Sequence, residues 1–296
     1  MNPSSHLGQE FPIGELMARF TEEWNKRREQ TDKPVTRIAS FNLLVVSRGG
    51  REEGLQEVLQ GLAKSHPSRT IWSKIDSDRE WSNSTGRLHL GCGNHGDQVC
   101  SEQIQICCSN EPQRVSSLLL PLIRSGLPTH LLWWHAGPPE GDLFDRLADR
   151  CQLVLLADSD WSELCETLPS LWEDPMKSEH SFYPLNWFRL TKARQQIATA
   201  YNNAEVELAF PKDIGAPGPV ADLLTLWLRS LLPERDFQSG AVRIVSSAEA
   251  KVPTVNWNDR QDPLKIQSDL DAVREALDRP YRDPVFNGIV HKIKER

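Results

Sequence analysis

The stretch TRIASFNLLVVSRGGREEGLQEVLQGLAKSHPSRTIWSKI, residues 36–75, shows how strands and helices alternate in this chain. It opens with a nearly continuous apolar run at residues 36–47 and closes with a second strand-like run at residues 68–75. Between them, apolar residues recur at the spacing of one helical face: Leu55, Val58, Leu59 and Leu62. A strand, a helix and a second strand in this order predict a crossover unit with two parallel strands.

The same alternation continues to about residue 165. Two short strands flank a glycine-rich segment, and they are followed by a helix at residues 112–126, a strand at 129–134, a helix at 138–150 and a strand at 152–159. Pro121 lies inside the first of these helices and is expected to kink or shorten it. Apolar strands separated by crossover helices predict a doubly wound, mainly parallel α/β domain of three layers. We expect this Rossmann-like domain at residues 34–166.

An amphipathic helix precedes that domain, within residues 1–33. Its apolar residues recur along one helical face: Ile13, Leu16, Met17, Phe20 and Trp24. Such a stripe needs a surface to cover it, either the domain that follows or a partner. Because most such stripes pack within their own chain, we expect this one to pack on the domain.

The second half of the chain has a shorter and more interrupted pattern. Residues 167–184 contain three prolines and no sustained period, which predicts a linker. Residues 185–296 alternate short helical and strand-like segments and predict a second, smaller α/β domain. Within them, Asp262-Pro263 and Asp283-Pro284 each place a capping residue before a proline, which predicts the start of a helix at both positions.

The stretch GCGNHG, residues 91–96, matches the G-x-G-x-x-G pattern of dinucleotide-binding loops. That pattern binds a pyrophosphate only where a helix follows the loop, whereas residues 97–108 alternate with the period of a strand. Glycines are also the residues that a turn between two strands requires, so we expect a turn and no nucleotide. The spacing of Cys92, His95 and Cys100 matches no common zinc motif. We expect neither a metal nor a cofactor.

A stronger candidate for binding is SHPSRTIW, residues 65–72. His66, Ser68 and Arg69 lie between a helix and a strand, and this combination of side chains often holds a phosphate or a carboxylate. A structural interpretation is also available, because Pro67 ends the helix, Ser68 caps, and Arg69 can pair with a nearby acid. Both interpretations remain open from the sequence. No nucleophile elbow, phosphate-binding loop or metalloprotease motif indicates a catalytic set.

Composition and charge exclude further function classes. The 296 residues include 25% charged side chains and carry a formal net charge of −7, without a basic stripe. We therefore expect no nucleic acid and no membrane as partners. The sequence shows neither a leader pattern nor a long apolar run, and the six cysteines lie mostly in apolar strand-like segments. These features favour a cytoplasmic protein with reduced cysteines.

Several segments, taken in order, resemble the glucose-6-phosphate dehydrogenase assembly protein family, known as OpcA. They are HPSRTIW, VCSEQIQI, SLLLPLIRSGLPTHLLWW, LLADSDW, LNWFRLTKARQQIATAY and SDLDAVREALDRPYRDPVF. The resemblance implies a protein that is not an enzyme. It implies instead a factor that binds glucose-6-phosphate dehydrogenase, promotes its active oligomer and raises its activity in the oxidative pentose phosphate pathway. By position alone it implies five residues that bind the partner or an anion: His66, Ser68, Arg69, Trp133 and Trp134.

The alternative hypothesis is a sugar-phosphate-binding enzyme or sensor. It would use His66, Ser68 and Arg69, together with Asp158 or Asp160 at the carboxyl end of a strand, where open α/β sheets bind their ligands.

Overall fold

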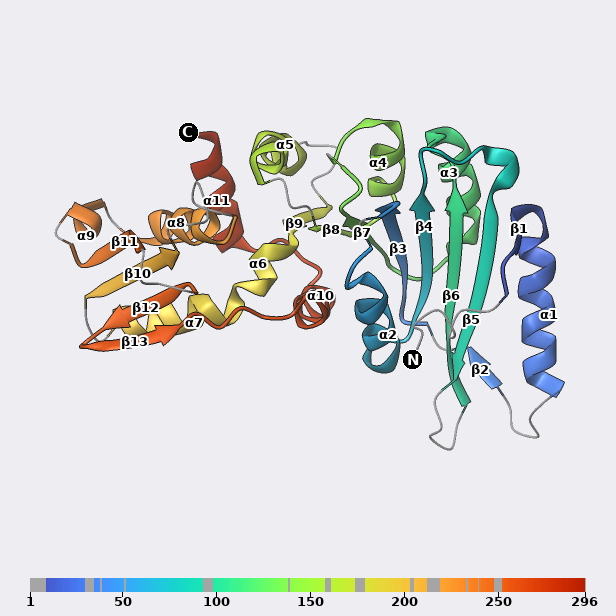
Figure 1. The fold of residues 1–296 in the computed structure, drawn as a ribbon, viewed down its shortest axis with the longest axis horizontal. Coiled ribbons are helices and arrows are strands. Elements are labelled where there is room, and N and C mark those ends of the chain that lie inside the picture. Colours follow the sequence, from blue (N-terminus) through green and yellow to red (C-terminus); the bar gives the residue numbers. More distant parts are fainter. Residues whose placement is uncertain are drawn as a thin grey trace. The chain divides into compact units, whose positions relative to one another are not determined.

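The computed structural model divides the chain into two compact units (Figure 1). The first contains residues 1–158 and 179–182, and the second contains residues 159–178 and 183–296. The residues that the structure describes are 9–29, 35–37, 39–50, 52–92, 98–137, 139–157, 161–173, 179–202, 205–211, 219–232, 234–238, 240–247 and 252–295.

The first unit is built around a mainly parallel sheet, as the sequence predicts. Its strands are β1 (Phe11–Pro12), β2 (Val35–Arg37), β3 (Phe41–Arg48), β4 (Ser68–Ile75), β5 (Thr85–Cys92), β6 (Gln98–Cys108), β7 (Thr129–Trp134), β8 (Leu153–Ala157) and β9 (Ser181–Pro184), and the last two residues of β9 belong to the second unit. They are arranged in the order β1-β5-β6-β4-β3-β7-β8-β9, with β2 paired to β6. The strands β6, β4, β3, β7 and β8 are parallel, and β5 is antiparallel to β6.

Helices cover both faces of this sheet. They are α2 (Leu55–Ser65), α3 (Pro112–Leu119) and α4 (Gly141–Ala148). The crossover through α2 leads from β3 to one side and the crossover through α4 leads from β7 to the other, so right-handed connections put the two helices on opposite faces. Pro121 shortens the predicted helix at 112–126, because α3 ends at Leu119 and continues only as a 3-10 turn, η4 (Leu120–Leu122).

The strand order reverses at β3. Its neighbours are β4 on one side and β7 on the other, and both run parallel to it. The carboxyl ends of β3 and β7 therefore form the topological switch point of the sheet, the place where doubly wound folds bind their ligands.

The amphipathic N-terminal segment forms a 3-10 turn, η2 (Ile13–Glu15), and then α1 (Leu16–Glu29). Leu16, Phe20 and Trp24 are buried, whereas Met17 is 59% exposed. The backbone of Gly86 lies directly under this segment, since a Cβ there would lie 2.8 Å from the Phe11 ring and 3.5 Å from Leu16. The stripe thus packs on its own unit, as predicted.

The glycine-rich segment separates two strands, as predicted, and not a strand and a helix. The strands β5 and β6 are antiparallel, and their register ends with Cys92 opposite Cys100. Residues 93–97 lie outside the described residues. The element that follows them is the strand β6, whereas a dinucleotide-binding loop requires a helix at that position.

The second unit contains a smaller mixed sheet with strands in the order β11-β10-β12-β13. These strands are β10 (Val206–Pro211), β11 (Val242–Ser247), β12 (Thr254–Trp257) and β13 (Arg260–Pro263). The helices of the unit are α5 (Trp161–Glu173), α6 (Leu185–Arg189), α7 (Thr191–Tyr201), α8 (Pro219–Leu231), α9 (Glu234–Gln238), α10 (Asp269–Asp278) and α11 (Pro284–Lys294).

One expectation for the second half needs correction. Within the predicted linker at 167–184, the described residues are the end of α5, which continues through Pro169 to Glu173, and β9, which begins at Ser181. No helix starts at Pro263, which instead ends β13; α10 starts later, where the Ser268 hydroxyl caps the N–H of Asp271 at 3.2 Å. The other predicted start is confirmed, since Asp283 caps α11 through the N–H of Val285 at 2.8 Å.

Candidate functional site

The structure separates the five predicted site residues between opposite edges of the first sheet. Asn42 of β3 pairs with Arg69 of β4 on one side and with Thr129 of β7 on the other. Arg69 and Thr129 therefore lie at the same height along the parallel strands. Trp133 follows Thr129 by four residues, which places it about 13 Å further along the strands. His66, Ser68 and Arg69 therefore lie at the amino edge of the sheet and Trp133 and Trp134 at the carboxyl edge, too far apart for one small ligand.

The Arg69 side chain contacts an acidic and an aromatic side chain of the first unit. Its Nε lies 3.5 Å from an Oε of Glu102 on β6, and its guanidinium lies 5.0 Å from the centre of the Phe20 ring. Only 13% of the Arg69 side chain and 6% of the Glu102 side chain are exposed. Burial lowers the pKa of Arg69, and the charge of Glu102 opposes that shift. The acid that the structural interpretation requires is therefore Glu102.

The two polar neighbours of Arg69 also have local partners. The Ser68 side chain is buried, and its hydroxyl lies 3.1 Å from that of Thr70. His66 ends α2, with its N–H bonded to the carbonyl of Leu62 at 2.7 Å and its Nδ1 2.9 Å from the Ser65 hydroxyl. His66, Ser68 and Arg69 each have a local partner, although the Arg69 Nε has no hydrogen-bond acceptor among the described residues, and the anion-binding role stays a prediction.

Replacing Arg69 by alanine is expected to cost about 2 kcal/mol of stability, because it removes the cation that faces the buried Glu102 carboxylate. Replacing Glu102 by glutamine in the same variant should restore part of the loss. Arg146→Ala is the matched control, since it breaks a half-exposed ion pair with Asp142 and should cost less than about 0.5 kcal/mol. Urea unfolding compares the three; equal losses for Arg69→Ala and Arg146→Ala would contradict the structural role.

The two adjacent tryptophans project to opposite faces of the sheet and are both buried. The Trp133 ring meets Phe144 of α4 edge-on at 5.2 Å, and its indole N–H donates to the carbonyl of Gly137 at 2.8 Å. Trp134 packs beside the His135 ring at 5.5 Å. Their burial makes both residues part of the core, and a direct contact with a partner stays a prediction.

In the second unit, residues from three distant segments build one aromatic cluster, which the sequence patterns do not reveal. Phe286 of α11 contacts the rings of Trp172, Tyr183 and Trp187 at 5.3, 5.0 and 5.1 Å. These residues come from α5, β9 and α6, and Phe286 ends the segment SDLDAVREALDRPYRDPVF. The two resembling segments of the second half thus meet in one core.

Polar contacts complete this cluster. The Trp187 indole N–H donates to Asp283 at 3.3 Å, and the Arg194 guanidinium lies 3.1 Å from the centre of the Trp187 ring. Burial lowers the pKa of Arg194 to about 10, against the opposing charges of Asp283 and Glu275. Trp187 lies on α6 and Arg194 on α7, so this contact depends on how the two consecutive helices are joined at Leu190.

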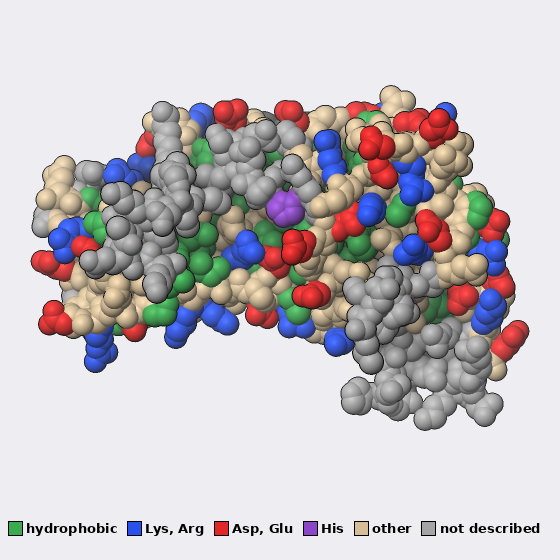
Figure 2. All heavy atoms as spheres, viewed as in Figure 1, with side chains coloured by type: hydrophobic (Ala, Val, Ile, Leu, Met, Phe, Trp, Pro, Cys, Tyr) green, Lys and Arg blue, Asp and Glu red, His purple; other side chains and the backbone are tan. Residues whose placement is uncertain are grey.

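Among the described residues, no three metal-ligating side chains come together, and no helix is long and apolar enough to span a membrane. Figure 2 shows acidic and basic side chains interspersed over the face that it draws. Within each unit, the coloured residues of that view form no continuous basic stripe of the kind that nucleic-acid-binding surfaces carry.

Known proteins resemble part of this chain. Residues 60–171 match a family described as the glucose-6-phosphate dehydrogenase subunit N-terminal domain. A protein of Nostoc punctiforme named putative OxPP cycle protein OpcA is 30% identical over 143 residues, which are 45% of this chain and 30% of that protein. A protein of the same name from Synechococcus elongatus is 29% identical over 109 residues, 36% of this chain and 24% of that protein. The match thus spans less than a third of either relative.

One solved structure gives a weak match. It is described as trehalose-6-phosphate from E. coli bound with UDP-2-fluoro glucose, and it is 12% identical over 81% of this chain and 69% of that chain. Its TM-score of 0.25 is too low to indicate a shared fold.

Proposed function

We propose that the chain is a member of the glucose-6-phosphate dehydrogenase assembly protein family, OpcA, and a non-catalytic partner of glucose-6-phosphate dehydrogenase, because residues 60–171 match that family's model and two putative OpcA proteins are 30% and 29% identical over part of the chain. It would act in the cytoplasm, in the oxidative pentose phosphate pathway. The observation that carries the proposal is the family match, which runs from α2 through β4, β6 and β7 to α5 and so includes most of the first sheet.

The geometry of the first unit supports this proposal over an enzyme or sensor that uses His66, Ser68 and Arg69. Glu102 balances the charge of Arg69, and the Ser68 hydroxyl lies beside that of Thr70, so each side chain has a partner within the first unit. Asp158 and Asp160, which the alternative also requires, lie outside the described residues.

The mechanism that we propose is a population shift. A protein that binds the active form of the dehydrogenase more tightly than the inactive form stabilises the active form by the difference in binding free energy. A coupling of about 1–3 kcal/mol would change the apparent substrate affinity roughly 5- to 150-fold. No side chain of the chain has to enter the dehydrogenase active site for this effect.

Titrating the chain into its cognate dehydrogenase is expected to change KM or kcat until the partner is saturated, and the two proteins should elute together on size exclusion. Linkage requires the reciprocal effect, so a substrate that favours the active form should tighten the complex by the same factor. The control is an unrelated protein of similar size and charge at equal concentration. Unchanged kinetic constants combined with separate elution would refute the proposal.

A further inference from the structure

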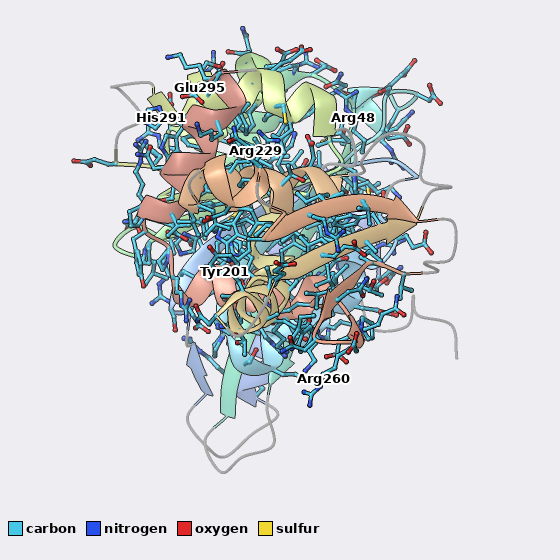
Figure 3. The ribbon with its side chains drawn as sticks, turned by 90° about the vertical axis from the view of Figure 1, so that its left-hand side faces the viewer. Arg48, Tyr201, Arg229, Arg260, His291 and Glu295 are labelled. Atoms are coloured by element: carbon cyan, nitrogen blue, oxygen red, sulfur yellow. The ribbon has the colours of Figure 1, made fainter. Side chains whose placement is uncertain are left out.

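The antiparallel strands β5 and β6 place two cysteines directly opposite each other. Their register runs without interruption from Thr85 opposite Cys107 to Cys92 opposite Cys100. Residues that are opposed in this way lie on the same face of the sheet. Figure 1 labels β5, β6 and β2 in this part of the first unit, and Figure 3 shows the same strands turned by 90°. A disulfide between neighbouring strands needs its two cysteines at such opposed positions.

Two hydrogen bonds at the borders of the hairpin show which sides the backbone groups of its residues face. In a strand, the N–H and the C=O of one residue point to the same side, and successive residues alternate between the two sides. The carbonyl of Ser84 accepts the N–H of Ile13, on the side of β5 that faces β1. The carbonyl of Cys108 accepts the N–H of Asp76, on the side of β6 that faces β4.

Both hydrogen bonds give the same assignment for the cysteine pair. Steps of two residues lead from Ser84 to Cys92 and from Cys108 back to Cys100, so the backbone groups of both cysteines point away from the opposite strand. The two residues therefore form a non-hydrogen-bonded pair, in which the Cα atoms lie about 4.5 Å apart. This separation falls within the range of about 4.4–6.8 Å that a disulfide spans.

The two other cysteines of the hairpin lack this arrangement. Cys107 lies opposite Thr85, and Cys108 follows it on the opposite face of β6. Burial raises the pKa of the Cys107 thiol and raises that of Cys108 to about 11. Because the thiolate is the reactive form, both thiols are weak nucleophiles at neutral pH. Within the described part of the hairpin, the register thus brings together one pair of cysteines, Cys92 and Cys100.

We propose that Cys92 and Cys100 form a reversible disulfide that closes the end of the β5–β6 hairpin. The oxidant is a small disulfide of the glutathione type. The thiolate of one cysteine attacks a sulfur of this molecule, breaks its S–S bond and releases one small thiolate. The second cysteine attacks the protein sulfur of the mixed disulfide and releases the other small thiolate. The two protein thiols lose two electrons and two protons in total, and the small disulfide gains them and becomes two thiols.

The bond is reversible because of the compartment that we propose for this chain. Lasting disulfides are typical of oxidising compartments, whereas glutathione keeps most cytoplasmic thiols reduced. The disulfide would therefore form under oxidising conditions and be reduced afterwards. While present, it would fix the register of the two strands, which otherwise depends on backbone pairing and on the buried face. The proposal does not depend on the partnership with the dehydrogenase.

Equilibration of the whole chain in glutathione buffers tests the disulfide. At each ratio of oxidised to reduced glutathione, free thiols are blocked, and the protein is unfolded and cut before Asp97 and after Glu102. These cuts separate Cys92 from Cys100 and both from the other cysteines of the hairpin, so the disulfide joins two fragments until it is reduced. In the native chain, half of the pair should be oxidised at a ratio about tenfold lower than in urea, because the folded hairpin holds the two cysteines in register.

Two variants distinguish the effect of register from simple proximity along the chain. Cys107→Ser keeps the opposed pair and should oxidise as the wild type does. Gly91→Cys combined with Cys92→Ser moves the first cysteine by one position, to the opposite face of β5, and lengthens the closed loop by one residue only. This double variant should need a ratio about tenfold more oxidising. Circular dichroism shows whether each variant is folded.

Three outcomes would overturn the proposal. The two fragments could remain separate even at the most oxidising ratio, or the double variant could oxidise as readily as the wild type. The bond could also form between two chains, which would be seen as a yield that rises with protein concentration.

Discussion

Replacing Phe286 by alanine is expected to destabilise the second unit by about 3–5 kcal/mol, which is the usual cost of removing a buried phenylalanine ring. Its side chain is 0% exposed and contacts the rings of Trp172, Tyr183 and Trp187. The cavity would open at the place where α5, β9, α6 and α11 meet, and four elements joined through other contacts have little freedom to collapse into it. Urea unfolding followed by tryptophan fluorescence measures the loss as a lower midpoint.

The same segment supplies the control for this prediction. Tyr281 lies five residues before Phe286 and its side chain is 64% exposed, so Tyr281→Ala should change stability by less than about 0.5 kcal/mol. The backbone carbonyl of Tyr281, which accepts the Tyr183 hydroxyl at 2.9 Å, is kept in that variant. Similar midpoints for Phe286→Ala and Tyr281→Ala would show that the aromatic cluster does not hold the unit together. Because the chain has two units, the unfolding curve has to be fitted with separate transitions.

Acidification is expected to destabilise the first unit through His130. The side chain lies on β7, is 4% exposed and packs 5.3 Å from the Phe41 ring, and its Nδ1 has no hydrogen-bond partner among the described residues. Burial lowers the pKa of His130 from 6.5 to about 4. The unfolded chain therefore takes up this proton first. The stability contributed by neutral His130 is complete above pH 6.5 and is lost as the pH falls towards 4, by about 3 kcal/mol at pH 4.

Comparison with a variant that cannot titrate isolates this effect from the protonation of carboxylates. In His130→Phe, the loss of stability between neutral pH and pH 4 should be smaller than in the wild type by about 3 kcal/mol. His130→Leu provides a second replacement in case the phenylalanine ring does not fit. His66→Phe is the control, because His66 is only half-buried, and it should follow the wild type. Identical pH profiles for the wild type and His130→Phe would refute the assignment.

At the candidate site, the sequence predicted the local arrangement of the residues but not their partners on other strands. The sequence places His66, Ser68 and Arg69 between a helix and a strand, where α2 and β4 are found, and the pairing of Arg69 with an acid is one of the two interpretations that it leaves open. It does not identify that acid, because Glu102 lies on β6 and becomes a neighbour only through the pairing of β4 with β6.

The helix start predicted at Asp262-Pro263 was wrong because of a contact between strands. Asp262-Pro263 and Asp283-Pro284 are locally equivalent signals, yet only the second starts a helix. Pro263 instead ends β13, opposite Thr254 of β12, in the outermost position of the small sheet. A proline is tolerated on such an edge strand because its missing N–H has no partner to satisfy there. Strand pairing across ten residues of chain thus overrode the capping signal.

The sequence by itself determined the properties that depend on neighbours within a few residues. These include the limits of β4 and β7, the shortening of α3 at Pro121, the capped start of α11, and the strand after GCGNHG that excludes a dinucleotide loop. Only the tertiary structure decided which strands are adjacent, where the switch point lies, and which side chains meet in the aromatic cluster. The physical reason is that hydrophobic period, capping and turn preferences are local, whereas strand order and burial depend on contacts between segments far apart in the chain.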